Sequence, residues 1–266
     1  MASMKRINFT KMQGAGNDFI VFDLDTIVGL DLPDLARRVC DRHFGVGADG
    51  LLAALPSESA DLQMLYLNSD GSAAEMCGNG LRCLARYAAD RGEVSGDSFE
   101  IETAAGIRQV SLKTDGSSRV GMGVPEVGEK VELRGHRFLR VSMGNPHAVT
   151  FLRDERAVKE LELREIGPRV EGDSAFLEGT NVEFASLRTE SGAVRMRIWE
   201  RGAGETLASG TGSCATAVAA IHHGLAESPV TVLLDGGRVE VEWPGAGEQA
   251  HMTGPAEYVC SGEFFL

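Results

Sequence analysis

The sequence predicts a two-domain protein of the sheet-rich α/β (α+β) class. Its 266 residues exceed the usual size of one hydrophobic core, so two domains of about 130 residues are expected. Thirty-three glycines separate short segments of strand character, and few segments have a helical pattern. Two similar glycine turns also precede two apolar helical segments, which indicates an internal duplication.

Five segments have the β-branched and aromatic content of strands: Phe99–Thr103, Ile107–Leu112, Phe138–Met143, Val194–Trp199 and Val230–Leu234. Three segments are predicted to be helices: Pro33–His43, Leu81–Asp90 and Ser213–His223. The first has proline at its first helical position, and the others end near the glycines Gly92 and Gly224. Because the last two are apolar almost all round, we expect sheet to enclose each of them as the central helix of a domain.

The duplication is indicated by two pairs of turns. The residues 77–80 (CGNG) align with 209–212 (SGTG) at an offset of 132, and 16–19 (GNDF) align with 144–147 (GNPH) at an offset of 128. This interpretation predicts one half over residues 1–118, a second over 119–255, and a C-terminal tail, 256–266, that returns to the first half. Short glycine matches also arise by chance, so the alternative that the chain has no internal repeat stays open on this pattern alone.

Composition restricts the class of partner. A net charge of −13 and a pI near 4.9 argue against nucleic acid and anionic membranes, since both require a basic face. No apolar run approaches the roughly 18 residues of a membrane span. The first residues, MASMKRINF, have no secretory pattern, and five cysteines, an odd number, fit a reducing compartment. We therefore expect a cytoplasmic protein with a small-molecule partner.

Cys77 is the first candidate for chemistry, because it stands in a glycine turn immediately before a helix. Unpaired backbone N–H groups and the helix dipole stabilise an anion there, so the sulfur could act as base or nucleophile, or the turn could bind a carboxylate. The alternative is a small buried residue. The other cysteines, Cys40, Cys83, Cys214 and Cys260, are interpreted as structural, and no metal-ligand spacing is found. The segment GVGADG matches GxGxxG but follows a helix, which disfavours a nucleotide site.

Two further segments carry candidate groups. His147 follows a Gly-Asn-Pro turn and precedes a strand, from where it could orient or deprotonate a thiol, although a loop histidine is often merely solvated. Glu200 and Arg201 end a strand before a glycine loop and a helix, and Arg201 could hold a carboxylate with two hydrogen bonds. Exposed charges beside a flexible loop are the alternative.

Six motifs, in this order, resemble the diaminopimelate epimerase family: MQGAGNDFIVFD, FGVGADGLL, NSDGSAAEMCGNGLRC, SMGNPHAVTF, GTNVEF and WERGAGETLASGTGSCATA. The resemblance implies two similar domains, each a mixed, mostly antiparallel sheet rolled around a central helix, with the active site in the cleft between them. It also implies a homodimer and a diamino diacid substrate. The family's reaction serves lysine and peptidoglycan precursor synthesis.

The resemblance further implies a cofactor-independent mechanism. One cysteine takes the α-proton and another, on the opposite face, returns one, while N–H donors stabilise the charge that develops on the α-carboxylate. By resemblance Cys77 is one acid/base, assisted by His147, and Glu200 assists the second position. The implied substrate contacts are Asn17, Asn68, Gly78, Asn79, Asn145, Asn181, Glu200, Arg201, Gly210 and Thr211.

The chain departs from the family pattern at the second position, where Ser209 replaces cysteine. A serine hydroxyl ionises at far higher pH than a thiol, so Ser209 is expected to be a poor base near neutrality even beside Glu200, although it could still relay a proton. Three explanations stay open: an engineered change, a natural use of Ser209 with Glu200, or a single strong base with another outcome. The alternatives to epimerisation are a related amino-acid racemase, a one-base isomerase or dehydratase of the same fold, or an inactive protein that binds the amino acid.

Overall fold

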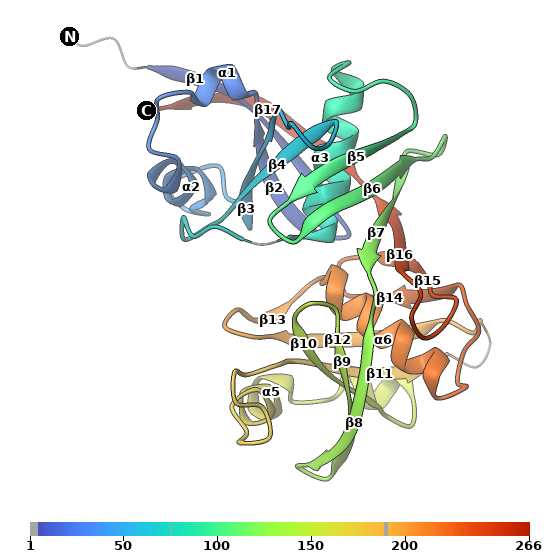
Figure 1. The fold of residues 1–266 in the computed structure, drawn as a ribbon. Coiled ribbons are helices and arrows are strands. Elements are labelled where there is room, and N and C mark those ends of the chain that lie inside the picture. Colours follow the sequence, from blue (N-terminus) through green and yellow to red (C-terminus); the bar gives the residue numbers. More distant parts are fainter. Residues whose placement is uncertain (1–4, 75, 189–190) are drawn as a thin grey trace. The chain divides into compact units, whose positions relative to one another are not determined.

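The computed structural model describes residues 5–74, 76–188 and 191–266. The chain divides into two compact units, one comprising Met1–Val120 with Gly254–Leu266 and the other Gly121–Thr253. The boundaries expected from the sequence lie at 118/119 and 255/256. The strands β7 (Ser117–Gly123) and β16 (Ala250–Pro255) carry the chain from one unit to the other (Figure 1).

The first unit contains the elements β1 (Arg6–Gly14), β2 (Asn17–Phe22), α1 (Leu24–Ile27), α2 (Leu32–Cys40), β3 (Gly50–Leu55), β4 (Leu62–Asn68), α3 (Gly78–Asp90), β5 (Ser98–Thr103), β6 (Gly106–Leu112), the start of β7 (Ser117–Gly123) and β17 (Glu257–Phe265). The pairs β1–β2, β3–β4, β5–β6 and β6–β7 are antiparallel, whereas β2–β3 and β4–β5 are parallel. The parallel pairs need crossovers, which α1 with α2 and α3 supply.

The second unit repeats this plan. Its elements are β8 (Glu126–Leu133), β9 (His136–Ser142), β10 (Pro146–Phe151), α4 (Glu155–Lys159), α5 (Leu163–Glu171), β11 (Asn181–Leu187), β12 (Val194–Glu200), β13 (Gly204–Thr206), α6 (Gly210–His222), β14 (Val230–Leu233), β15 (Arg238–Glu242) and most of β16 (Ala250–Pro255). Again β10–β11 and β12–β14 are parallel, and β9–β10, β11–β12 and β14–β15 are antiparallel. The expected fold class, two similar units of mixed sheet, is confirmed.

The duplication extends over the secondary structure. The elements β12, α6 and β14 each begin 132 residues after β4, α3 and β5. The C-terminal strand β17 pairs antiparallel with β1, as β8 pairs with β9 in the second unit. The tail therefore supplies the first unit with the strand that β8 supplies to the second.

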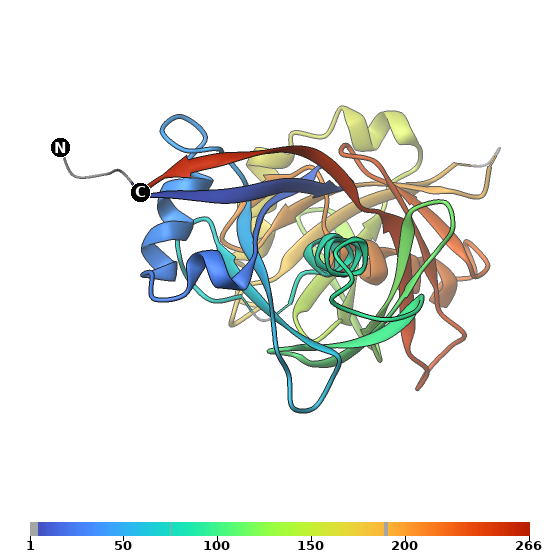
Figure 2. The same cartoon turned by 90° about the horizontal axis from the view of Figure 1, so that it is seen from above.

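Both central helices are buried and have 13 residues. Figure 2 shows α3 (teal) end-on among the strands of its unit, and α6 buries nearly every residue from Gly210 to Ala220. Each helix is followed, after one capping residue, by a glycine in the left-handed conformation, Gly92 at φ 72° and Gly224 at φ 66°, as predicted. Separate cores lie between the sheets and the outer helices, around Leu35 on α2 and Val170 on α5.

The five predicted strands are confirmed to within two residues at each end. The predicted helix Pro33–His43 was too long, because α2 ends at Cys40. The Asp41 carboxylate there accepts hydrogen bonds from the backbone N–H groups of His43 and Phe44, both at 2.7 Å, which favours a turn over another helical residue. Among the described residues, none of the helices combines the length and hydropathy needed to span a membrane.

Candidate functional site

Cys77 is the N-cap of α3, with the extended backbone (φ −133°, ψ 115°) that this position requires. Its sulfur accepts a hydrogen bond from the Gly80 N–H at 3.5 Å and donates one to the Asn17 carbonyl oxygen at 3.3 Å. The N–H donor stabilises a thiolate, whereas the carbonyl oxygen stabilises the thiol. The structure thus adds an acceptor to the donor-rich environment that the sequence predicted.

Two asparagine side chains stand beside this sulfur. Asn79, which is buried, donates from Nδ2 to the Asn17 oxygen at 3.3 Å, and Asn17 donates from its own Nδ2 to Asp49 at 2.5 Å. Arg82, also buried, donates to the Asn79 oxygen at 2.9 Å. We call Asn17, Asp49, Cys77, Asn79 and Arg82 the Cys77 cluster.

The remaining predicted contacts of the first unit lie close by. Asn68 is the last residue of β4 and pairs with Gly50, the residue that follows Asp49. Its amide donates to the Ser72 hydroxyl at 3.0 Å. Gly78 is buried as the first residue of α3, where its backbone N–H belongs to the unpaired start of the helix.

Ser209 is the N-cap of α6, with φ −137° and ψ 125°. Its Oγ accepts from the Gly212 N–H at 3.2 Å, and its side chain is almost fully buried. Glu200, at the end of β12, accepts a hydrogen bond from the Thr206 hydroxyl, and the nearby Ser209 hydroxyl acts to lower the pKa of the Glu200 carboxyl. Burial raises the pKa of the Glu200 carboxyl, and the Thr206 hydrogen bond and the nearby His147 oppose that rise.

His147 lies within β10 and is 1% exposed, so it is not the solvated loop residue of the alternative interpretation. Its Nδ1 lies 2.6 Å from Glu183 Oε1 and its Nε2 lies 3.0 Å from the Asn145 oxygen. Asn145 in turn donates from Nδ2 to the Thr211 hydroxyl, on the first turn of α6, at 3.4 Å. Burial raises the pKa of Glu183, and the imidazole opposes this.

Asn181 and Arg201 are joined through the backbone. The Asn181 amide donates to the Pro146 carbonyl at 2.9 Å, and its oxygen accepts from the Arg201 N–H at 3.0 Å. The Arg201 guanidinium is exposed and donates to the Glu178 carbonyl at 3.0 Å. Because a carbonyl uses few of its five N–H donors, the guanidinium keeps the capacity to bind a carboxylate.

The predicted residues therefore gather in two places, one in each unit. The first is the Cys77 cluster with Asn68 and Gly78. The second, which we call the Ser209 cluster, comprises Asn145, His147, Asn181, Glu183, Glu200, Arg201, Ser209, Gly210 and Thr211. The predicted assistance of Cys77 by His147 stays a prediction.

Sequence reasoning did not single out Asp49 or Glu183. Glu183 is fully buried within β11, whose other residues are mostly apolar, and a charged residue inside such a run is a signal for a paired buried charge. Asp49 stands in GVGADG, a segment that also belongs to the family-like motif FGVGADGLL but in which no residue was predicted to belong to the site. Its signal was the carboxylate itself, next to a strand that begins at Gly50.

Three of the other cysteines, Cys40, Cys83 and Cys214, are buried. Burial raises the pKa of Cys40 and of Cys83 to about 12, which makes both poor bases. Cys214 is buried in α6, Cys260 is exposed, and none of the five is in a disulfide. In the part of the chain that the structure describes, no group of three or more His, Cys, Asp or Glu residues is placed to bind a metal ion.

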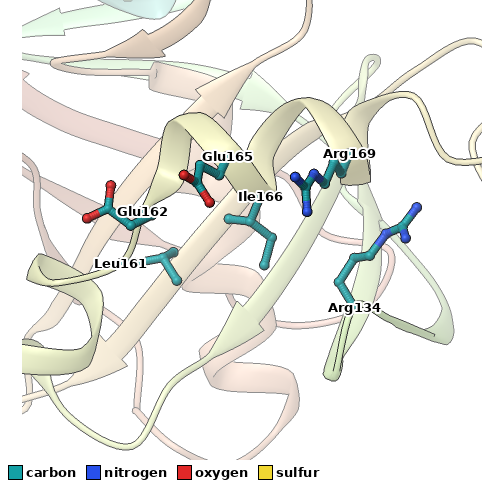
Figure 3. A pocket seen from close by; sticks show the side chains of 6 residues that line it. All are labelled: Arg134, Leu161, Glu162, Glu165, Ile166 and Arg169. Carbon is teal, nitrogen blue, oxygen red and sulfur yellow. The ribbon is translucent and has the colours of Figure 1, made fainter.

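A cavity of about 250 Å³ lies elsewhere, beside α5 (Figure 3). Its lining residues are Arg134, Leu161, Glu162, Glu165, Ile166 and Arg169. The carboxylates lie toward one end and the guanidinium groups toward the other. None of these residues belongs to either cluster, so the cavity is not part of the candidate site.

Sequence comparisons match the chain to one family over nearly its whole length. The sequence model of the family described as diaminopimelate epimerase matches residues 9–128 and 139–259. The chain is 45% identical to a diaminopimelate epimerase of Pelotomaculum thermopropionicum, covering 97% of this chain and 99% of that protein. It is 44% identical to the diaminopimelate epimerase of Desulfitobacterium hafniense, covering 96% of this chain and 97% of that protein.

Solved structures share the fold at low sequence identity. A phenazine biosynthesis protein of the PhzF family from Bacillus anthracis superposes with a TM-score of 0.82 at 18% identity, covering 99% of this chain and 100% of that one. A hydroxyproline epimerase from Agrobacterium vitis has a TM-score of 0.70 at 18% identity, covering 100% and 93%. At such identities the likeness concerns the fold alone.

Proposed function

The chain belongs to the diaminopimelate epimerase family, and we propose that it interconverts L,L- and meso-diaminopimelate by moving the α-proton without a cofactor. The observation that carries the proposal is the repeated N-cap. Cys77 and Ser209 each place a proton-carrying side chain at the start of a buried 13-residue helix. The rest of each cluster is composed of amides, carboxylates, guanidinium groups and backbone donors, with the His147 imidazole in the second, and these groups suit an amino acid.

The helix starts supply the stabilisation that the reaction needs. Removing the α-proton of an amino acid moves negative charge onto its α-carboxylate, and without an electron-sink cofactor only fixed donors can stabilise it. The backbone N–H groups that begin at Gly78 and Gly210 are such donors, and the helix dipoles act in the same direction. Asn79 and Thr211 follow them on the same first turns.

The proton itself is moved by the two N-caps. In this proposal Cys77 exchanges a proton with the α-carbon on one face, assisted by His147, and Ser209 does so on the other. Glu200 assists Ser209 as the base that its hydroxyl requires, because a serine is a weak acid and a weak nucleophile on its own. Cys77 and Ser209 must both reach the same α-carbon, and this requirement is part of the proposal.

The substrate's distal amino-acid end explains the remaining residues. Diaminopimelate carries a second carboxylate and ammonium, which need a cation and neutral acceptors. We assign the carboxylate to Arg201 and the other polar contacts to Asn17, Asn68, Asn145 and Asn181. The guanidinium fork of Arg201 fits a carboxylate with two hydrogen bonds.

Proton exchange in deuterated water tests the proposal. The protein is incubated with L,L- or meso-diaminopimelate, loss of the α-proton signal is followed by NMR, and the isomers are separated by chiral chromatography. Histidine and proline serve as alternative substrates. We expect exchange with diaminopimelate and none above background for the other two, and Cys77→Ala abolishes it. Exchange with proline or histidine in place of diaminopimelate overturns the substrate assignment.

Ser209 supports two other candidates, a one-base isomerase that completes only part of the reaction and a protein that only binds the amino acid. A one-base isomerase predicts exchange without epimerisation. A binding protein predicts saturable binding of diaminopimelate, measured by calorimetry, with no exchange at all. The exchange experiment and calorimetry together thus separate the three functions.

The accompanying assignments are also part of the proposal. We assign the enzyme to the cytoplasm, as a homodimer without a nucleic-acid partner, and its two epimerase halves to residues 1–118 with 256–266 and to 119–255. The net charge of −13 supports the absence of a nucleic-acid partner, because no basic excess is available for phosphates. Light scattering on the purified chain measures the oligomeric state.

A further inference from the structure

Two amide side chains in the Cys77 cluster connect two groups of opposite charge. Arg82 donates to the Asn79 oxygen at 2.9 Å, Asn79 donates to the Asn17 oxygen at 3.3 Å, and Asn17 donates to Asp49 Oδ2 at 2.5 Å. Asp49 Oδ1 accepts from Arg42 at 2.8 Å. The four residues from Arg82 to Asp49 therefore form one directed chain of hydrogen bonds.

The charges at the ends fix the direction of both amides. A guanidinium has only donors, so Asn79 must turn its oxygen toward Arg82 and its N–H toward Asn17. An ionised carboxylate has only acceptors, so Asn17 must turn its N–H toward Asp49. The oxygen of Asn17 is thereby left facing Cys77 Sγ, 3.3 Å away.

This orientation affects the protonation of the sulfur. A carbonyl oxygen accepts from an S–H group and repels a thiolate, whereas an amide N–H in the same place would favour the thiolate. The hydrogen-bond chain itself contains two charged groups, Arg82 and Asp49. Arg42 pairs with Asp49, and both Arg42 and Lys11 pair with Asp18. Asp49 accepts a hydrogen bond from the N–H end of the Asn17 amide, whose other end, the oxygen, faces the sulfur.

We propose that Asp49 is a positioning residue of the reaction, which acts through the Asn17 amide to hold a carbonyl oxygen against the Cys77 sulfur. Asp49 thereby favours the thiol, the form that returns a proton to the α-carbon, and it fixes Asn17 for the substrate. The catalytic part of this inference rests on the proposed function, but the effect on the sulfur does not.

An isosteric pair of variants isolates the hydrogen bond. Asp49→Leu removes the acceptor for the Asn17 amide and the charge together. Asp49→Asn removes the charge but keeps an oxygen, which turns toward the two donors on that side, Asn17 Nδ2 and the Asp18 N–H. Arg42 keeps its hydrogen bonds to both oxygens of Asp18, so the second variant loses little else.

The first measurement needs no substrate. Each variant is treated with iodoacetamide at a single pH near neutrality, and alkylation of the Cys77 peptide is followed by mass spectrometry, with thiolate absorbance at 240 nm measured against a Cys77→Ala background. We expect Asp49→Leu to raise the alkylation rate and the thiolate absorbance about 3- to 10-fold, the effect of one hydrogen bond. Asp49→Asn stays within about twofold of the parent protein. Equal behaviour of the two variants assigns the effect to charge or to the Arg42 ion pair and overturns the proposal.

The second measurement uses diaminopimelate. Asp49→Leu is expected to raise KM more than it lowers kcat, since Asn17 loses its fixed orientation for the substrate. Asp49→Asn restores KM. If the protein does not turn over diaminopimelate, the proposed function fails while the alkylation result still tests the hydrogen-bond chain.

A further variant guards against misfolding. Should Asp49→Leu lose its circular dichroism signal, Asn17→Leu removes the carbonyl oxygen from the sulfur directly and is expected to give the same increase in alkylation. In a folded Asp49→Leu/Asn17→Leu double variant, the increase is no larger than for Asn17→Leu alone, because both changes break one chain. Additive increases overturn the proposal.

Discussion

Cys77 and Ser209 occupy the same position in the two repeats of the chain. Each is the N-cap of a 13-residue helix, their φ angles are −133° and −137°, and each accepts a hydrogen bond from the N–H three residues on, Gly80 or Gly212. The two side chains differ only in their γ atom, which is sulfur in Cys77 and oxygen in Ser209. A cysteine at 209 therefore fits the local backbone without rearrangement.

Ser209→Cys is expected to raise the rate of epimerisation by about tenfold or more, because a thiol ionises at far lower pH than a hydroxyl and so exchanges its proton more readily near neutral pH. In the parent protein, one diastereomer should exchange its α-proton with deuterated water much faster than it epimerises. Both rates are measured on the same samples, by NMR and chiral chromatography. An epimerisation rate that is unchanged or lower in Ser209→Cys contradicts this account.

Ser186→Cys is the matched control for that variant. Ser186 is a fully buried serine on β11 of the same unit, and its hydroxyl has no hydrogen-bond partner among the described residues. The change therefore adds a buried sulfur to the unit but not to the N-cap of α6. We expect neither exchange nor epimerisation to rise.

Glu200→Gln is expected to remove an acidic limb from the pH profile of kcat/KM. Burial raises the pKa of Glu200, and only the ionised carboxylate can accept the Ser209 proton. Activity of the parent protein should therefore fall as pH decreases through a pKa above 4.5, the ordinary value. The Gln variant should be slower and flat over that range. Glu248→Gln, at an exposed turn, should keep the parent profile.

The same pKa has a consequence for stability. The folded protein keeps a proton on Glu200 that the unfolded chain has lost, so the free energy of unfolding falls as pH rises from the ordinary value of 4.5 to the raised one. Glu200→Gln has no proton to lose, and its stability should decline less over that interval. Urea unfolding at a series of pH values measures the difference, and an equally steep decline in both proteins excludes it.

Much of the fold could be predicted because its signals are local. The glycines after α3 and α6 and the small residues before them mark both helices, and the repeat at 132 residues follows from the matching turns. The length of α2 could not be predicted, because its end depends on the Asp41 side chain competing for backbone N–H groups. The contact between His147 and Glu183 could not be predicted either. The two residues are 36 positions apart in the sequence, and the parallel pairing of β10 with β11 brings them together.

Arg82→Met is expected to destabilise the first unit by about 3–5 kcal/mol, because three buried acceptors lose hydrogen bonds from a charged donor, each worth about 1.5–3 kcal/mol, while the cost of burying that charge is removed. Arg82 has no exposed surface and donates to the Asn79 side chain and to the carbonyls of Gly78 and Pro255, which would lose a buried donor. Thermal unfolding followed by circular dichroism measures the effect. Arg86→Met, one turn along, is the control: Arg86 is partly exposed, so water can replace its hydrogen bonds, and a loss below about 1 kcal/mol is expected.

Gly80 and Gly212 are equivalent positions in the two repeats, but their surroundings predict that they tolerate an added methyl group differently. A Cβ at Gly212 would lie 2.6 Å from Ile198 Cδ1, 3.0 Å from Glu183 Oε1 and 3.1 Å from Ser209 Oγ, whereas a Cβ at Gly80 would meet only Met64 and Phe19 atoms at 3.3 Å among its three nearest neighbours. Gly212→Ala should therefore displace the carboxylate that holds His147 and lower kcat/KM by at least about tenfold, at a cost of about 1–3 kcal/mol in stability. Gly80→Ala should keep kcat/KM within about threefold, because its neighbours are the ends of apolar side chains that can shift by a few tenths of an ångström. Steady-state kinetics and thermal unfolding of the two variants make the comparison, and a larger loss of activity in Gly80→Ala would show that the Glu183 and Ser209 contacts do not limit the reaction.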